Sequence, residues 1–219
     1  DLDAAFCLRY RAGRWRWLLP LLGEKFERMM ASAVSVTAGS SCLAAYSQRF
    51  NRSVTMLPSC VDTDHYLPVL QKSSDLADPS FTIGWIGSPS TAPYLQLLVE
   101  PLQELAHERS VRLLVVGAPA PVIFGVEVIE KPWSLQHELS LIHQFDVGVM
   151  PLPDSQWARG KCAYKLIQCM ACAIPVIASP VGANVNVVPP SCGLLPSTSS
   201  EWLSAFRQLA ANPDLRNRL

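Results

Sequence analysis

Three cations stand close together at the start of an apolar run in the segment ARGKCAYKLIQCMACAIPVIASPVG, residues 158–182. They are Arg159, Lys161 and Lys165. We expect a helix to begin here, and positive side chains are unfavourable at the amino end of a helix because the helix dipole is positive there. A bound anion removes this conflict. The helix amides and the three cations together could hold a diphosphate.

The spacing within this segment favours one polar helix face. A helix over 161–172 places Lys161, Lys165 and Gln168 four and three residues apart, which brings them to the same side. The other faces of this helix are apolar. The alternative interpretation is a solvated patch of Lys and Arg side chains with no ligand.

A second candidate is the loop GSPST at 87–91, which follows an expected strand at 81–87. Gly87 would let a ligand approach the backbone closely. Ser88 offers a hydroxyl group, and the amides that open the next helix can bind an anion. The alternative is an ordinary turn between a strand and a helix, with hydroxyl groups as caps.

Trp133 ends a further expected strand and could stack on a base or form one wall of its site; it could equally belong to the core. The four histidines are dispersed. Their spacing indicates neither a Ser-His-Asp arrangement nor a metal site, and the sequence contains no G-x-G-x-x-G or Walker motif.

The elements that must position these residues alternate between strand and helix. This rhythm predicts an α/β fold: a Rossmann-like, doubly wound parallel sheet, with part of a second Rossmann-like domain before it. We expect strands at 33–38, 54–59, 81–87, 111–118, 126–133, 146–153, 175–180 and 193–197. We expect helical pieces within 14–31 and helices from Ser40 or Ser41 to about Phe50, over 93–108, 134–145 and 161–172, and from Ser199 to a stop at Pro213.

Composition excludes some function classes. The 219 residues carry 18 Lys and Arg against 18 Asp and Glu, a formal net charge of +0, which argues against a nucleic-acid partner. No apolar run approaches the roughly 18 residues that a membrane-spanning helix needs. Arginines interleave with Tyr10, Trp15 and Trp17 near the start. This suits peripheral contact with a membrane or, alternatively, a surface helix.

Seven cysteines in no recognisable framework favour a reducing, cytoplasmic location, and we expect the protein there, either free or peripheral at the inner face of the membrane. Cys169 and Cys172 form a C-x-x-C with Cys162 upstream. We expect no metal there, because no second Cys/His pair has ligand spacing.

Several motifs together resemble a known family. The blocks FTIGWIGSPSTAPYL, LLVVG, FDVGVMPLPDSQWARGKCAYKLIQCMACAIPVIASPVG and CGLL follow one another as in the donor-binding domain of GT-B glycosyltransferases of the large retaining, sucrose-synthase-like group. The region before them resembles the hinge side of that family's first domain. Its matching residues are Asn51, Val54, Pro58, Val61, Asp62, Tyr66 and Pro68.

The resemblance implies transfer of a sugar, with retention, from a nucleotide-diphosphate sugar to a saccharide or lipid-linked acceptor, without a metal or other cofactor. It implies that Gly87, Ser88, Trp133, Lys165 and Gln168 bind the donor. It also implies catalytic roles as charge partners for two residues, Arg159 and Lys161. The family's helix carries two glutamates eight positions apart, and here those positions hold Gly160 and Gln168.

We therefore expect residues 1–69 to be the end of an acceptor-side domain, 70–80 a linker and 81–219 a donor domain incomplete at its end. Because the chain begins with Asp1, we expect a piece of a longer protein, inactive by itself. The alternatives are a nucleotide-sugar-binding module or pseudoenzyme without activity, a sugar-nucleotide epimerase, and an unrelated α/β domain with a basic rim.

Overall fold

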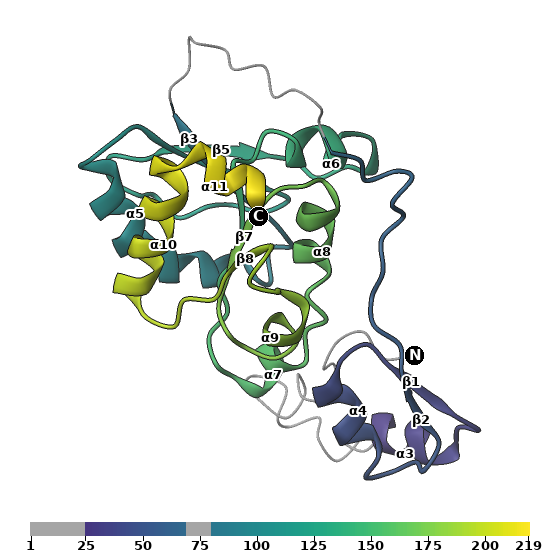
Figure 1. Ribbon diagram of the computed structural model, residues 1–219. Coiled ribbons are helices and arrows are strands. Elements are labelled where there is room, and N and C mark those ends of the chain that lie inside the picture. Colours follow the sequence, from purple (N-terminus) through teal and green to yellow (C-terminus); the bar gives the residue numbers. More distant parts are fainter. Residues whose placement is uncertain (1–24, 69–79) are drawn as a thin grey trace. The chain divides into compact units, whose positions relative to one another are not determined.

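The computed structural model describes residues 25–68 and 80–219 (Figure 1). The predictions on the Arg- and Trp-rich start and on nearly all of the linker at 70–80 lie outside these residues. Contacts divide the chain into two units, and the predicted domain limits stay a prediction. Among the described residues, the first unit holds 25–60, 153–163 and 181–186, and the second holds 61–68, 80–152, 164–180 and 187–219.

The first unit is built on a strand–helix–strand repeat. Strands β1 (Val36–Ala38) and β2 (Val54–Met56) pair in parallel, and helix α4 (Ser41–Ser47) connects them. The Ser40 hydroxyl accepts a hydrogen bond from the Leu43 backbone N–H at 3.4 Å, which confirms the predicted cap. Helix α4 ends three residues before Phe50. The same unit contains α3 (Lys25–Ser32) and α7 (Gln156–Arg159).

The second unit contains a parallel sheet of six strands within the described residues. Its strand order is β5-β4-β3-β6-β7-β8. From β3 the chain adds β4 and β5 on one side and then β6, β7 and β8 on the other, and all neighbouring strands are parallel. This is the doubly wound order, and it confirms the predicted fold class. The strands are β3 (Phe81–Ile86), β4 (Val111–Val116), β5 (Glu127–Lys131), β6 (Val147–Met150), β7 (Val176–Ala178) and β8 (Gly193–Leu194).

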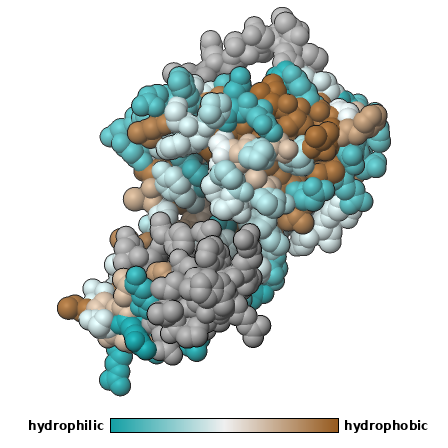
Figure 2. Space-filling view, turned by 180° about the vertical axis from the view of Figure 1, so that it is seen from behind, coloured by the Kyte–Doolittle hydropathy of each residue, from teal (hydrophilic) through white to brown (hydrophobic). Residues whose placement is uncertain are grey.

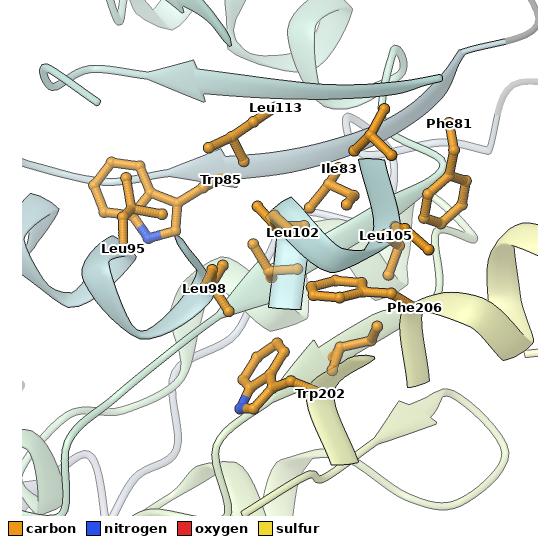
Figure 3. Packing of buried hydrophobic residues seen from close by; sticks show 14 of the residues in the cluster. Phe81, Ile83, Trp85, Leu95, Leu98, Leu102, Leu105, Leu113, Trp202 and Phe206 are labelled. Atoms are coloured by element: carbon orange, nitrogen blue, oxygen red, sulfur yellow. The ribbon is translucent and has the colours of Figure 1, made fainter. Parts of the chain in front are cut away.

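Helices cover both faces of this sheet. On one face, Ile83 and Trp85 of β3 point toward the leucines of η2 (Ala92–Leu98) and α5 (Val99–Ala106), and Trp202 and Phe206 of α10 (Ser199–Ala211) close the same core (Figure 3). All of β3 is buried, as expected for a central parallel strand with a continuous apolar sequence.

The other face is packed so closely that two strand positions require glycine. A Cβ atom at Gly84 would lie 1.9 Å from the Phe145 ring, and one at Gly148 would lie 2.6 Å from the sulfur of Cys169. Cys169 belongs to α8 (Tyr164–Ala171), and Phe145 follows α6 (Leu135–Ile142). Helix α8 and the segment that follows α6 therefore pack directly on the central strands.

Two predicted helices differ from the structure at their ends. The single helix expected over 93–108 is a 3-10 helix, η2, followed by α5; Pro93 lies in its first turn and Pro101 within α5. The helix α10 is capped by Thr198 instead of a serine. Pro213 ends it as predicted but also opens another helix, α11 (Pro213–Arg218), because proline is well tolerated in a first helical turn.

Hydrophobic and hydrophilic residues are mixed on the surface (Figure 2). The large apolar side chains exposed on the second unit include Val122 and Phe124, between β4 and β5. No helix in the described part of the chain is long and apolar enough to cross a membrane.

Candidate functional site

The carboxyl ends of the parallel strands in the second unit bring together two predicted site residues, Gly87 and Trp133, and one that was not predicted, Gly117. The Gly87 N–H donates to the carbonyl oxygen of Val116 at 3.0 Å, and the Gly117 N–H donates to that of Lys131 at 2.9 Å. The segments that follow β3, β4 and β5 thus lie side by side. This edge is where ligands bind in open parallel sheets.

Gly117 is essential to this arrangement. Its φ of +88° is a backbone conformation that favours glycine, and a Cβ atom there would lie 2.5 Å from the Gly87 oxygen and 3.1 Å from the Cβ of Trp133. Sequence reasoning missed Gly117. The available signal was a glycine directly after the buried run VRLLVV.

The loop that begins with Gly87 and Ser88 uses its hydroxyl groups internally. The hydroxyl oxygens of Ser88 and Ser90 lie 2.8 Å apart, and the Thr91 hydroxyl donates to the Ser88 carbonyl at 3.0 Å. The following element is the 3-10 helix η2, and the Thr91 and Ala92 N–H groups at its start already donate to the Ser88 carbonyl oxygen, so the expected free helix amides are not present at this position. What the loop offers a ligand is its backbone and the exposed side of Ser88.

Trp133 is half exposed, at 50%, so it does not belong to the core. Its indole N–H donates a hydrogen bond to the Glu138 carboxylate. The ring is thereby held at the edge of the sheet, beside Gly117.

Glu138 is the centre of a buried polar network, which we call the Glu138 network: Glu138 with Tyr66, Trp133, Lys165 and Gln168. Only 4% of Glu138 is exposed. Its Oε1 accepts from the Tyr66 hydroxyl and from the Gln168 Nε2, each at 2.5 Å. Its Oε2 accepts from Trp133 and lies 3.9 Å from the Lys165 Nζ. All five residues belong to the second unit.

The network keeps Glu138 ionised. Burial raises the pKa of its carboxyl group, but the hydrogen bonds from Tyr66 and Trp133, the charge of Lys165 and the Gln168 bond outweigh this, and the net pKa is lowered. Burial and the neighbouring carboxylate raise the pKa of Tyr66, so its hydroxyl stays a donor. Burial lowers the pKa of Lys165, and Glu138 partly opposes this.

Gln168 lies at a position where the family resemblance implied a donor-binding residue. Its side chain is 0% exposed, and its Nε2 also donates to the Tyr66 hydroxyl at 2.6 Å. Its Oε1 is buried without a hydrogen-bond partner among the described residues. Glu138 was missed as a site residue, although its place three and four residues before the apolar Leu141 and Ile142 indicated the inner face of its helix.

The predicted helix over 161–172 is wrong at its start. Helix α8 begins at Tyr164, because Ala163 has a φ of 58°, which is outside the helical range. Lys161 therefore precedes the helix and does not share a face with Lys165 and Gln168. Those two do lie on α8 together.

Arg159 and Lys161 belong to the first unit, and the helix-dipole argument does not apply to either. Arg159 is the last residue of α7, where a cation is favourable. It forms two hydrogen bonds with the Asp154 carboxylate, at 2.5 and 2.7 Å, and both side chains are more than half exposed. The backbone of Gly182 packs against that of Arg159.

Lys161 lies over the ring of Trp157, with its Nζ 5.2 Å from the ring centroid. Burial lowers the pKa of this lysine. Within the described residues it forms no ion pair with a carboxylate. It is therefore a cation whose charge is available to an anionic ligand.

The C-x-x-C cysteines are packing residues. Cys169 and Cys172 are both buried, and burial raises their pKa to about 12 and about 11 respectively. Such thiols are poor metal ligands and poor nucleophiles at neutral pH. Among the described residues, no group of three or more His, Cys, Asp or Glu is placed to hold a metal ion.

The family model described as glycosyl transferases group 1 matches residues 80–212, more than half of the chain. The chain belongs to this family. No curated protein matches the sequence significantly.

Solved structures of GT-B glycosyltransferases have the same fold. Sucrose-phosphate synthase from Thermosynechococcus elongatus matches with a TM-score of 0.65 and 19% identity, over 99% of this chain and 59% of that one. WaaG, a glycosyltransferase involved in lipopolysaccharide biosynthesis, matches with a TM-score of 0.69 and 16% identity, over 96% and 62%. Anabaena HepE, in complex with UDP and glucose, matches with a TM-score of 0.66 and 15% identity, over 85% and 56%. The chain thus spans about three fifths of these structures.

Proposed function

We propose that the protein transfers a sugar, with retention of configuration, from a nucleotide-diphosphate sugar to a saccharide or lipid-linked acceptor. The observation that carries this proposal is the edge formed by Gly87, Gly117 and Trp133 in a chain of the glycosyl transferases group 1 family. There, bare backbone and a half-exposed indole ring meet at the position where parallel sheets bind nucleotides. Cytoplasmic location and membrane contact are part of the same proposal.

The base of the donor is proposed to pack against Trp133. An indole ring held at one end by a hydrogen bond offers a flat, rigid surface for stacking. Nucleotides are present in solved structures of the same fold: Anabaena HepE was solved with UDP and with UDP-glucose, and starch synthase IV from Arabidopsis thaliana with ADP and acarbose.

The departing diphosphate is proposed to be stabilised by Lys161, with Arg159 and Lys165 as further cations. Charge develops on the leaving group in the transition state, and a positioned cation lowers the energy of that state. Lys161 is the strongest candidate because no described carboxylate neutralises it. Arg159 already shares its charge with Asp154, and Lys165 shares its charge with Glu138.

A second candidate function is nucleotide binding without turnover. It is favoured by two positions at which the family resemblance implies glutamates. Gly160 offers no side chain, and the amide nitrogen of Gln168 is engaged by Tyr66 and Glu138. Such a protein would bind the donor but transfer nothing.

The test combines a binding panel with a turnover assay. We expect one nucleoside diphosphate or nucleotide sugar to raise the melting temperature, and Lys161→Ala to lower turnover by about a hundredfold, the typical loss for one charge-stabilising donor. Lys25→Ala, which removes the same charge from the exposed start of α3, is the matched control and should leave turnover unchanged. Turnover within twofold of the parent protein in Lys161→Ala contradicts the assigned role. Binding without turnover in the parent protein favours the second candidate.

A further inference from the structure

The Glu138 network contains more polar groups than packing alone requires. A buried carboxylate is costly to desolvate, and apolar side chains of similar volume commonly give equal or better stability. Here one carboxylate is surrounded by donors from the segment before residue 68, from the loop after β5 and from α8. An arrangement of this cost calls for a reason beyond stability.

The network has an inner and an outer end. Gln168 and Glu138 are buried at the inner end, whereas half of the Trp133 surface is exposed at the outer end. The hydrogen bond from the indole N–H fixes the rotation of the ring, and Gly117 leaves room for the Trp133 Cβ atom. The carboxylate therefore determines how the exposed ring is presented.

We propose that Glu138 is a positioning residue that fixes the Trp133 ring as the wall of the nucleobase site, and that residue 168 must be uncharged for Glu138 to do so. This inference rests on the proposed function. It adds a role for Glu138 and the requirement for an uncharged side chain at position 168, neither of which the proposed function needs.

The requirement at position 168 follows from the distance between the two side chains. The Gln168 Nε2 lies 2.5 Å from the Glu138 Oε1. Glutamate at 168 would bring a second carboxylate to this distance, and two carboxylates in contact cannot both remain ionised. One of them takes up a proton, and the negative charge that accepts from Trp133 is then shared between the two side chains. Gln168→Glu should therefore weaken the hydrogen bond to Trp133, although the new side chain has almost the same size.

The exchange of both residues should repair the damage. In the double variant Glu138→Gln/Gln168→Glu, the new amide at 138 can accept from Trp133 through its oxygen and donate to the new carboxylate through its nitrogen. The Tyr66 hydroxyl can donate to that carboxylate. One negative charge is retained, together with the hydrogen bonds of residue 138 with Trp133 and with residue 168 and the one between Tyr66 and residue 168.

The experiment compares four variants with the parent protein by two readouts. The first readout is the NMR resonance of the Trp133 indole N–H, identified by its loss in Trp133→Phe. The second is the dissociation constant for the nucleoside diphosphate that binds the parent protein. Gln168→Glu should shift the resonance and weaken binding by about tenfold, the equivalent of one hydrogen bond to a charged group. The double exchange should restore both readouts. Arg207→Ala breaks an exposed ion pair elsewhere in the same unit and should leave both readouts unchanged.

The outcomes separate this inference from the proposed function. An unchanged resonance and affinity in Gln168→Glu, or no recovery in the double exchange, overturns the positioning role of Glu138. If Gln168→Glu does not fold, Trp133→Phe decides, because it keeps a ring but removes the hydrogen bond. Weaker nucleotide binding supports the inference, and unchanged binding overturns it. If the folded parent protein binds no nucleotide, the proposed function and the nucleobase role fail together, while the resonance still decides whether Glu138 holds Trp133.

Discussion

Charged side chains in the segment 153–163 are arranged differently from those around α6 and α8. In the segment 153–163, Arg159 and Asp154 pair at the surface, and Lys161 lies over an aromatic ring. In the second unit, Glu138 is buried and accepts hydrogen bonds from three different side chains. Lys161 of the first region was predicted to share one helix face with Lys165 and Gln168 of the second.

The difference separates the residues that can be changed at little cost from those that cannot. An exposed ion pair contributes little to stability because water screens it and because both side chains lose freedom. A buried carboxylate with its donors is costly to break, since the buried donors left behind, Tyr66 and Gln168, lose their charged acceptor. Variants of the first region should therefore report on function, and variants of the second on stability as well.

Removal of the central carboxylate should have the largest effect. Glu138→Ala leaves the Tyr66 hydroxyl, the Gln168 amide and the Trp133 N–H without their acceptor, and we expect a loss of about 3–5 kcal/mol in the free energy of unfolding. Urea denaturation measures it. Arg207→Ala, which breaks an exposed pair with Glu108 in the same unit, is the control and should have a much smaller effect. Equal losses in both variants would contradict the distinction between the two regions.

A change at Gly117 should have the next largest effect. Gly117→Ala forces a residue with a Cβ into φ +88° and against the Gly87 oxygen, so we expect a loss of about 1–3 kcal/mol in stability together with weaker nucleotide binding. Gly125→Ala is the matched control. Its φ is +79°, but its Cβ would approach only Ala106, so stability should fall while binding is kept. Calorimetric titration measures the nucleotide affinity of both variants, and equal affinities would contradict a role of Gly117 in binding.

The pH dependence of stability should show a smaller effect of the same network. The folded pKa of Glu138 lies below its unfolded value, so its contribution is present above the unfolded pKa of about 4.3 and is lost as the pH falls through the folded pKa. Thermal unfolding between pH 3 and pH 7, compared with Glu138→Gln, measures this contribution. Parallel pH curves for the two proteins would show that Glu138 has no lowered pKa.

The smallest effect on stability is expected at the exposed pair. Asp154→Asn removes the charge that holds the pKa of Arg159 raised but leaves both side chains at the surface. We expect no measurable change in the melting temperature and tighter binding of an anionic nucleotide, because Arg159 is then free of its partner. Asp214→Asn on α11 is the control for the loss of one negative charge. A clear drop in melting temperature would show that this exposed pair contributes to stability as the buried network does, and would contradict the prediction.

The sequence was sufficient for the sheet but not for the side-chain partners. The runs FTIGWI and VRLLVV are mostly apolar and do not alternate with polar residues, which is typical of central parallel strands, and both strands were predicted. The start of α8 was misplaced because Ala163 is a good helix former in isolation. Its left-handed conformation is set by its surroundings, which local propensity does not contain.

The candidate site was predictable in part for a similar reason. Gly87 and Trp133 stand at strand ends, and strand ends can be located from the apolar pattern. Glu138 meets Gln168 from a separate helix 30 residues away, and no spacing rule brings them together. Asp154, the bidentate partner of Arg159, is only five residues away in the sequence. This pair could not be predicted because the short helix α7, which brings the two side chains together, was not indicated by the sequence pattern.

The central claim is that the protein binds a nucleotide-diphosphate sugar, with the sheet edge of the second unit as the site of its base. The most direct test is calorimetric titration of nucleoside diphosphates and nucleotide sugars into the protein and into Lys161→Ala/Lys165→Ala. We predict saturable binding of one nucleotide that weakens by tenfold or more in the double variant, about 1.4 kcal/mol. Absence of binding by any nucleotide, or equal affinity in both proteins, would contradict the account.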